Sequence, residues 1–427
     1  MRYALINPRW DFEGSVYFGC REPHLSLELG YAREFLRREG HDAVLIDAHL
    51  LGLGTEDVRR IHEDFRPDFT VVLTAPTYLF WRCPQPELKV PKDLISAISG
   101  QAGRIVAIGP HGSATPVPVL KKLGADIVVM GEPEEILPKL ARSSDLKGVP
   151  SICFRDEGAL RIQGRPHETD VAALPALTWE SELLKSHLHH HHRFDSTPDG
   201  PGAEMETSRG CPYSCSFCAK ADFRNRYRKR PLQTVLKELD SLMSSGVSYV
   251  YFIDEIFMPD ERLLNALSDR GVKFGIQTRI DLWKTDTLEL LGRSGCVSIE
   301  AGVESITERG RALLGKRCER TTDELVNLLV IARNFVPFVQ ATLLATEADD
   351  AEMVENWRAC ADRLGIWATR PVPLFPYPGS EEYRRRWGIP DSSAWERAHE
   401  YYLSMYKNFS DIQESAPKPL KELERTE

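Results

Sequence analysis

The chain has 427 residues, of which 42% are hydrophobic and 27% charged, the composition of an ordinary globular protein. The formal net charge of -9 argues against a nucleic-acid partner, because surplus acid provides no basic field for phosphates. No stretch approaches the roughly 18–20 apolar residues that span a bilayer, and MRYALINPRW lacks the apolar core of a signal peptide. We therefore expect a cytoplasmic protein with no membrane span and no nucleic acid.

Residues 3–141 alternate strand and helix patterns five times. The helix pattern at Leu27, Tyr31 and Phe35 ends near Gly40, a residue suited to a left-handed C-terminal cap. The strand candidates are short apolar runs, which is typical of parallel strands covered on both faces: 3–8, 43–48, 69–75, 104–109 and 126–131. The pattern predicts a doubly wound, Rossmann-like α/β sheet, which binds ligands beyond the carboxyl ends of its strands.

A second α/β unit follows a connector. Residues 151–163 resemble a hairpin around Asp156–Gly158, and 164–203 are rich in Pro, His, Gly and Asp. Six further strand candidates predict an incomplete (β/α)6 TIM-type barrel with its chemistry at the C-terminal mouth: 203–208, 247–253, 273–279, 296–301, 338–345 and 368–375. We expect four parts in chain order: 1–145 (Rossmann-like domain), 146–203 (hairpin and His-rich connector), 204–390 (partial barrel) and 391–427 (helical, with a mobile tail).

The segment 209–218, RGCPYSCSFC, places three of the nine cysteines within eight residues. Structural zinc normally takes four ligands, whereas a four-iron cluster on three cysteines leaves one iron open to a ligand that is not protein. We expect Cys211, Cys215 and Cys218 to bind a [4Fe–4S] cluster, with a zinc knuckle completed by a histidine as the alternative. The remaining six cysteines are scattered, and buried small hydrophobes are their simplest interpretation.

The triad, with Phe217 just before its third cysteine, resembles the signature of the radical S-adenosylmethionine (radical SAM) superfamily. From about residue 1 to 390 the chain is similar to the cobalamin-dependent branch, and within it to the subgroup called the rhizo-twelve system. The resemblance implies three cofactors: the cluster, S-adenosylmethionine and cobalamin. It implies that the open iron holds S-adenosylmethionine, whose reductive cleavage yields a 5′-deoxyadenosyl radical that takes a hydrogen atom from the substrate.

The resemblance also implies S-adenosylmethionine contacts at the strand ends of the barrel. The acidic pair Asp254 and Glu255 matches the position that binds the methionine amino group, with a solvated strand end as the alternative. Arg279 matches a cation suited to the carboxylate, and Glu304 a position near the ribose. Lys316 and the turn before Ser380 also match the family pattern, whereas residues 343–349 (LLATEAD) depart from its usual glycine-rich fifth-strand turn.

In the first unit the resemblance implies cobalamin contacts at strand ends. They are Thr74, Gly109, Gly112, Gly131 and Glu132. Asp47, His49 and Gly52 have the D-x-H-x-x-G spacing of a lower cobalt ligand, but they follow the second strand instead of the first. We therefore expect no histidine below the cobalt. A sheet that docks the barrel without cobalamin is the alternative.

Two charged or titratable runs remain open. His189–His192 provide either acid–base groups or anion binders near the barrel mouth, or a solvated connector. Residues 223–231 (FRNRYRKRP) provide either cations for a cofactor or substrate, or a solvated face before a helix that starts at Pro231.

Taken together, the resemblance implies an enzyme that methylates an unactivated carbon. One S-adenosylmethionine methylates cobalamin, and a second generates the radical that opens a substrate C–H bond. A cyclase or ring-rearranging enzyme with the same cofactors, and a non-catalytic iron–sulfur sensor, are the alternatives. The expected partners are a small-molecule or natural-product-type substrate and an external electron donor of the flavodoxin or ferredoxin type.

Overall fold

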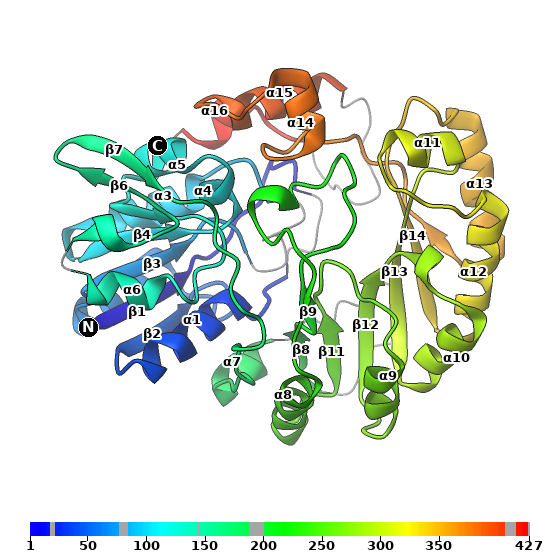
Figure 1. Cartoon of the computed structure of the whole chain (residues 1–427), viewed down its shortest axis with the longest axis horizontal. Helices are drawn as coiled ribbons and strands as arrows, with labels where there is room; N and C mark the ends of the chain where they lie inside the picture. The colour runs from blue at the N-terminus through cyan, green and yellow to red at the C-terminus, as the bar shows by residue number, and fades with distance from the viewer. Residues whose placement is uncertain are drawn as a thin grey trace.

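The computed structural model describes residues 1–17, 22–76, 84–101, 103–143, 145–187, 200–405 and 416–425. Two α/β units lie side by side, with C-terminal helices across one end of both (Figure 1). Among the described residues, no helix has the length and apolar character needed to cross a membrane.

The first unit is built on a seven-stranded sheet of order β2-β1-β3-β4-β5-β6-β7, whose first five strands are parallel. The strands are β1 (Arg2–Asn7), β2 (Asp42–Asp47), β3 (Phe69–Leu73), β4 (Arg104–Ile108), β5 (Ile127–Val129), β6 (Ile152–Asp156) and β7 (Ala159–Gln163). The helices are α1 (Leu27–Arg38), α2 (Thr55–Phe65), α3 (Lys89–Ile98), α4 (Pro110–Ala114), α5 (Pro116–Leu123) and α6 (Leu137–Arg142). The apolar runs of β3 and β5 are buried throughout, as expected for strands covered on both faces.

The predicted hairpin forms as β6 and β7, but it belongs to this first sheet. β6 pairs antiparallel with β5 through Ile127 and Phe154, and β7 pairs with β6. The sheet therefore extends beyond residue 145, the end that we predicted for the first domain, because Ile152–Phe154 form a buried run that covers the edge of β5.

The second unit is a six-stranded, all-parallel sheet of order β15-β14-β13-β12-β11-β8, curved but open between its edge strands. Its strands are β8 (Gly202–Met205), β11 (Tyr249–Phe252), β12 (Lys273–Thr278), β13 (Cys296–Glu304), β14 (Phe338–Leu343) and β15 (Trp367–Ala368). Helices cover its outer face (Figure 1): α8 (Leu232–Ser244), α9 (Glu261–Ser268), α10 (Thr285–Arg293), α11 (Glu308–Leu313), α12 (Thr322–Phe335) and α13 (Ala351–Arg363). The predicted fold class, a Rossmann-like sheet followed by an incomplete barrel, is confirmed.

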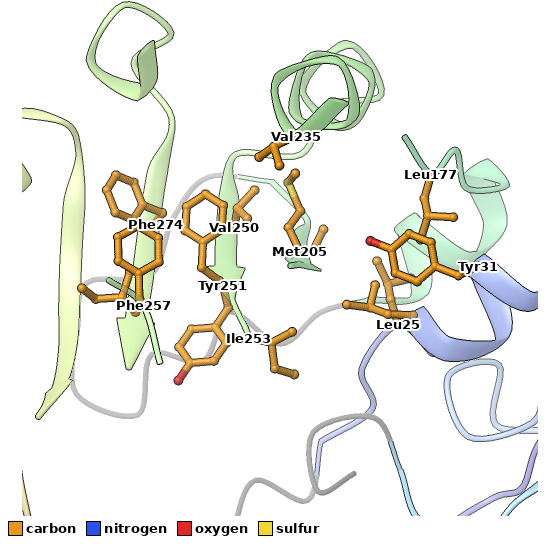
Figure 2. Close-up of a cluster of buried hydrophobic side chains, with 14 of the residues drawn as sticks. Leu25, Tyr31, Leu177, Met205, Val235, Val250, Tyr251, Ile253, Phe257 and Phe274 are labelled. Atoms are coloured by element: carbon orange, nitrogen blue, oxygen red, sulfur yellow. The ribbon is translucent and has the colours of Figure 1, made fainter. Parts of the chain in front are cut away.

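The hydrophobic core is continuous between the two units. Leu25 and Tyr31, at the start of the first unit, belong to the same buried cluster as Met205 and Val250 of the barrel strands. Figure 2 shows Leu177, from the connector, beside Tyr31 in this cluster. Because burial of apolar surface is the main favourable term in folding, this shared core holds the strand ends of the two units in a fixed relation.

The C-terminal helices α14 (Glu381–Trp387), α15 (Ala394–Met405) and α16 (Leu420–Leu423) pack on both units. The indole of Trp395 lies 4.6 Å from the His111 ring, centroid to centroid, and donates a 3.0 Å hydrogen bond to Thr115. Lys418 donates its N–H to the Gly14 carbonyl at 2.7 Å. The backbone of residues 416–425 thus contacts the first unit, and the mobility of the tail stays a prediction.

Candidate active site

The cysteine triad lies in the loop between β9 (Ser208–Arg209) and the short helix at Lys220–Asp222, at the mouth of the barrel. Two hydrogen bonds hold the loop backbone. Ser216 donates its N–H to the Leu314 carbonyl at 2.8 Å, and the Lys220 ammonium donates to the Cys211 carbonyl at 2.5 Å. Gly210, with φ of +77°, opens the loop, and a β-carbon there would collide with the Arg226 carbonyl. These contacts hold the loop that carries the side chains of the triad.

The three thiols have raised pKa values. Burial, together with the neighbouring Cys211 and Cys215, raises the pKa of Cys218 to about 12, and burial raises those of Cys211 and Cys215 as well. Thiols in this state become thiolate ligands only when a cation compensates them. Three cysteine ligands fit a [4Fe–4S] cluster with one open iron better than a structural zinc ion, which normally takes four protein ligands.

Three predicted or matched residues meet beside Cys215. Arg279 donates to the Lys316 carbonyl at 2.6 Å, and its guanidinium lies 3.9 Å from the centroid of Tyr213 in the cysteine loop. The Lys316 ammonium donates to the Gly302 carbonyl at 2.7 Å and pairs with Glu304 at 3.3 Å. The ends of β12 and β13 thus place Arg279 and Glu304 beside the loop, and the segment after α11 places Lys316 there.

Glu304 has an unusual backbone for its residue type, with φ of +68°. This left-handed conformation at the end of β13 is costly for a residue with a β-carbon. It turns the carboxylate toward Lys316, and the neighbouring Gly302 leaves room, because a β-carbon there would collide with Glu304. The strained backbone thus sets the direction of the Glu304 carboxylate, toward the Lys316 ammonium.

The acidic pair separates into two environments. Asp254 is fully buried, and its carboxylate accepts from the N–H groups of Thr207 at 2.7 Å and Ser208 at 3.1 Å. Burial raises the pKa of Asp254 to about 7. Glu255 accepts from the N–H of Gly210 at 2.9 Å and lies 3.5 Å from Arg224. Both carboxylates brace the segment that leads into the cysteine loop, and their contact with S-adenosylmethionine stays a prediction.

In the first unit, Thr74 and Gly109 meet at the ends of β3 and β4. A β-carbon on Gly109 would collide with the Thr74 hydroxyl, and φ of Gly109 is +135°. The Thr74 hydroxyl lies 3.1 Å from Nδ1 of His111, and Nε2 of His111 lies 2.7 Å from the Gln85 carbonyl. Gly112 packs against Val128, where a β-carbon would clash. The two glycines therefore make room for neighbouring side chains of the first unit, and the contact of these residues with cobalamin stays a prediction.

Gly131 and Glu132 have structural partners of their own. A β-carbon on Gly131 would collide with the backbone of His167. Glu132 is buried and pairs with Arg209 at 2.9 Å and with Arg228, both from the second unit. These contacts account for both residues without a ligand, so their role in cobalamin binding stays a prediction.

The basic run at 223–231 is neither an open cation patch nor a solvated face. Arg224 is buried and pairs with Glu206 at 2.6 Å and Glu28 at 3.2 Å. Arg230 pairs with Glu238 at 2.8 Å, whereas Arg226 is largely exposed beside Glu168. Most of the basic side chains in this run therefore lie in buried ion pairs, since unpaired charges in the interior are costly.

Sequence reasoning missed two members of this network, Arg209 and Glu206. Arg209 is fully buried and contacts Glu134 at 2.7 Å as well as Glu132, and it pairs with Glu206 at 2.9 Å. The spacing of Glu206 and Arg209, three residues apart, was the one local signal available. We call the set Glu28, Glu132, Glu134, Glu206, Glu255, Arg209, Arg224 and Arg228 the interdomain ion network.

A small hollow lies where the two units meet. Pro110 and Ala114 of the first unit line one side, and Ala219 and Phe223 of the loop after the triad line the other, with Trp395 closing it. His49 lies outside this hollow's lining and its Nδ1 accepts from the backbone N–H of Trp10 at 3.2 Å. His189–His192 lie outside the described residues.

A triad of cysteines at the mouth of a partial barrel, facing a Rossmann-type sheet, defines an iron–sulfur radical enzyme of two α/β units. Residues 205–356 match the model of the Radical SAM superfamily. This match confirms the predicted resemblance to the radical SAM superfamily over the barrel.

The relatives cover most of the chain. An uncharacterized methyltransferase of Pyrococcus horikoshii is 25% identical and covers 89% of this chain and 82% of its own length. Anaerobic magnesium-protoporphyrin IX monomethyl ester cyclase of Cereibacter sphaeroides is 24% identical, over 88% of this chain and 63% of the cyclase. Hopanoid C-3 methylase of Methylococcus capsulatus is 28% identical, over 84% of this chain and 68% of the methylase.

Two solved structures share the fold of both units together. The methyltransferase TsrM from Kitasatospora setae, with cobalamin and a [4Fe–4S] cluster bound, has a TM-score of 0.70 and 17% identity, over 89% of this chain and 76% of TsrM. The cobalamin-dependent enzyme OxsB, with aqua-cobalamin and S-adenosylmethionine bound, has a TM-score of 0.72 and 16% identity, over 95% of this chain and 66% of OxsB. The predicted resemblance to the cobalamin-dependent branch is confirmed at the level of fold.

Proposed function

We propose that this chain is a cobalamin-dependent radical SAM methyltransferase that adds a methyl group to an unactivated carbon of a small molecule. The observation that carries the proposal is the packing of the loop after the cysteine triad against the helix that follows β4 of the Rossmann-type sheet. Methyltransferases among the relatives, and TsrM among the solved structures, support methyl transfer.

The residues fit the three cofactors in distinct ways. Cys211, Cys215 and Cys218 would hold the cluster, which supplies the electron for cleavage of S-adenosylmethionine when bound. Arg279, Lys316 and Glu304 would orient the methionine and ribose ends of S-adenosylmethionine, because cations and a carboxylate converge there beside Cys215. Small residues at the ends of β3 and β4, among them Thr74, Gly109 and Ala114, would let the broad face of a corrinoid approach the backbone.

The proposal is tested by following the methyl group. Anaerobically reconstituted protein is incubated with a reductant, cobalamin and S-adenosylmethionine labelled in its methyl group, against candidate small molecules. We expect labelled product together with 5′-deoxyadenosine and S-adenosylhomocysteine. A product that never carries the label, despite 5′-deoxyadenosine formation, would contradict methyl transfer.

A second candidate is a cyclase that uses the same cofactors without methyl transfer, and the relative from Cereibacter sphaeroides favours it. The two candidates differ in stoichiometry. A methyltransferase of this mechanism consumes two molecules of S-adenosylmethionine per product and forms S-adenosylhomocysteine, whereas a cyclase forms none. A reduced, cluster-loaded protein that yields no 5′-deoxyadenosine with any substrate would instead favour the sensor alternative.

The enzyme also needs a source of single electrons. We propose a flavodoxin or ferredoxin as donor and the cytoplasm as its location, because thiol-ligated clusters and free cysteines persist in a reducing compartment. Pull-down of the cluster-loaded protein with a reduced flavodoxin, followed by 5′-deoxyadenosine formation without chemical reductant, tests the donor.

A further inference from the structure

A second set of metal-ligating side chains lies outside the cysteine loop. His24 precedes α1 of the first unit, His187 follows the connector helix α7 (Ser181–Ser186), and Glu204 lies in β8 of the barrel. The sequence separations are 180 residues between His24 and Glu204, and 17 between His187 and Glu204. The fold therefore assembles the three from the first unit, the connector and the barrel.

Their geometry is that of a ligand set. Nδ1 of His24 lies 2.6 Å from Oε1 of Glu204, and Nε2 of His187 lies 2.9 Å from both carboxylate oxygens. One ligand atom from each of the three lies within 4.8 Å of the others. Nitrogen and oxygen ligands bind zinc at about 2.0–2.2 Å. An ion at their centre would thus need only small movements of the side chains.

The charge around the set is unbalanced. The three side chains are only 3%, 1% and 1% exposed, in the order His24, His187 and Glu204. The carboxylate of Asp47, also buried, interacts electrostatically with His187. Among the described residues, no Lys or Arg forms an ion pair with Glu204 or Asp47. Two buried carboxylates beside two imidazoles need two positive charges, since unpaired buried charges are costly.

A divalent cation between the two imidazoles and Glu204 would supply that charge, and a set of two histidines and one glutamate is a known zinc ligand set.

We propose that His24, His187 and Glu204 bind one divalent transition metal of the zinc type, separate from the iron–sulfur cluster. The ion would join the segment before α1, the end of α7 and the first barrel strand at a single point. With three protein ligands, it would keep a fourth position for water or another small ligand. This proposal does not depend on the reaction that the enzyme catalyses.

The test removes the competing cluster site first. The full chain with Cys211→Ala, Cys215→Ala and Cys218→Ala is stripped with chelator, then loaded with zinc or cobalt(II). We expect about one equivalent of zinc per chain after desalting, a higher unfolding temperature with zinc, and cobalt(II) absorption bands typical of four- or five-coordinate nitrogen and oxygen ligands.

Variants then assign the site. His187→Gln and Glu204→Gln, in the same background, should each lose at least tenfold in zinc affinity. The matched control replaces His189–His192 by Asn, which removes four histidines close in sequence but should leave the equivalent of zinc in place. Circular dichroism of each variant without metal checks that it folds.

The outcomes are distinguishable. No retained zinc and no cobalt(II) bands in the unmutated histidine background would overturn the proposal. Zinc that survives His187→Gln but disappears with the His189–His192 variant would also overturn it, and would assign the metal to that run. Neither result bears on methyl transfer, which is tested with the cysteines intact.

Discussion

At the scale of single residues, the Cys218 thiol links the triad to its metal. With its pKa raised to about 12 by burial and by Cys211 and Cys215, it stays protonated at neutral pH unless a cation is present. We expect Cys218→Ala to abolish the iron–sulfur absorption and to reduce 5′-deoxyadenosine formation to background. Cys360→Ala, which alters an exposed cysteine on α13, should leave both unchanged. Full iron content in the Cys218 variant would contradict the assignment.

The buried carboxyl group of Glu206 should make the stability of the protein depend on pH. Burial alone would raise its pKa, but Arg209 and Arg224 outweigh burial and hold the pKa at about 2, below the ordinary 4.5. A carboxyl group whose folded pKa is depressed adds stability above its unfolded pKa and loses that contribution as the pH falls. The loss should therefore fall between pH ~4.5 and ~2.

Urea unfolding of the cluster-free triple-alanine chain at a series of pH values measures this effect. The chain should lose stability across that pH window more steeply than the same chain with Glu206→Gln, which has no titrating group at position 206. Equal slopes in the two chains would show that Glu206 is not held ionised by its arginines.

The residue scale also shows where sequence reasoning reaches its limit. Cys211, Cys215 and Cys218 could be predicted because their ligand spacing is local. His24 and Glu204 could not, because their 180-residue separation carries no pattern in the sequence. Glu132 was predicted as a cofactor contact from its place at a strand end, yet its partners Arg209 and Arg228 come from the other unit.

At the scale of elements, the two-stranded ribbon of β9 and β10 (Arg228–Lys229) carries the interdomain ion network. Arg209 on β9 is fully buried among three carboxylates, whereas the nearby Arg226 is 74% exposed beside Glu168. We expect Arg209→Gln to lower the free energy of unfolding by about 3–5 kcal/mol, because it leaves buried carboxylates uncompensated.

Arg226→Gln is the matched control, since an exposed ion pair contributes little to stability. Chemical denaturation of the two variants side by side gives the comparison. Similar small losses in both would mean that the buried network is replaced by water when Arg209 is removed.

The elements themselves were largely predictable from the sequence. Parallel strands buried on both faces are short apolar runs, so the five parallel strands of the first sheet and the first five of the barrel fall close to the predicted ranges. The sixth barrel strand is only Trp367–Ala368, where 368–375 was predicted. β13 runs on to Glu304, beyond the predicted 301, because Gly302 and Glu304 interrupt the apolar run while the pairing with β14 continues through a register shift between them. Membership of the hairpin in the first sheet depends on pairing across the sheet, which local patterns do not encode.

At the scale of the whole molecule, the C-terminal helices stabilise the junction of the units. Trp395 is 6% exposed and contacts His111 and Thr115 of the first unit, while Tyr402 packs on Phe375 of the second. Trp395→Ala should cost about 3–5 kcal/mol, as large-to-small changes in a core do.

Trp395 and Tyr402 belong to one apolar cluster with Phe375, Tyr377 and Tyr383. Deletion of residues 391–427 should expose the rest of this cluster and lower both the unfolding temperature and the yield of soluble protein. Trp387→Ala is the control, because Trp387 is only partly buried beside that cluster. Unchanged thermal unfolding after the deletion would mean that the two units hold together without these helices.

The return of residues 416–425 to the first unit has a topological consequence. Because Lys418 is tied to Gly14 and Leu88 donates its N–H to Glu424 at 2.9 Å, the chain begins and ends on the same unit. The barrel therefore lies, in chain order, between two segments that both pack on the first unit. A single break in the connector would leave two fragments that still elute together in native conditions and separate only in denaturant.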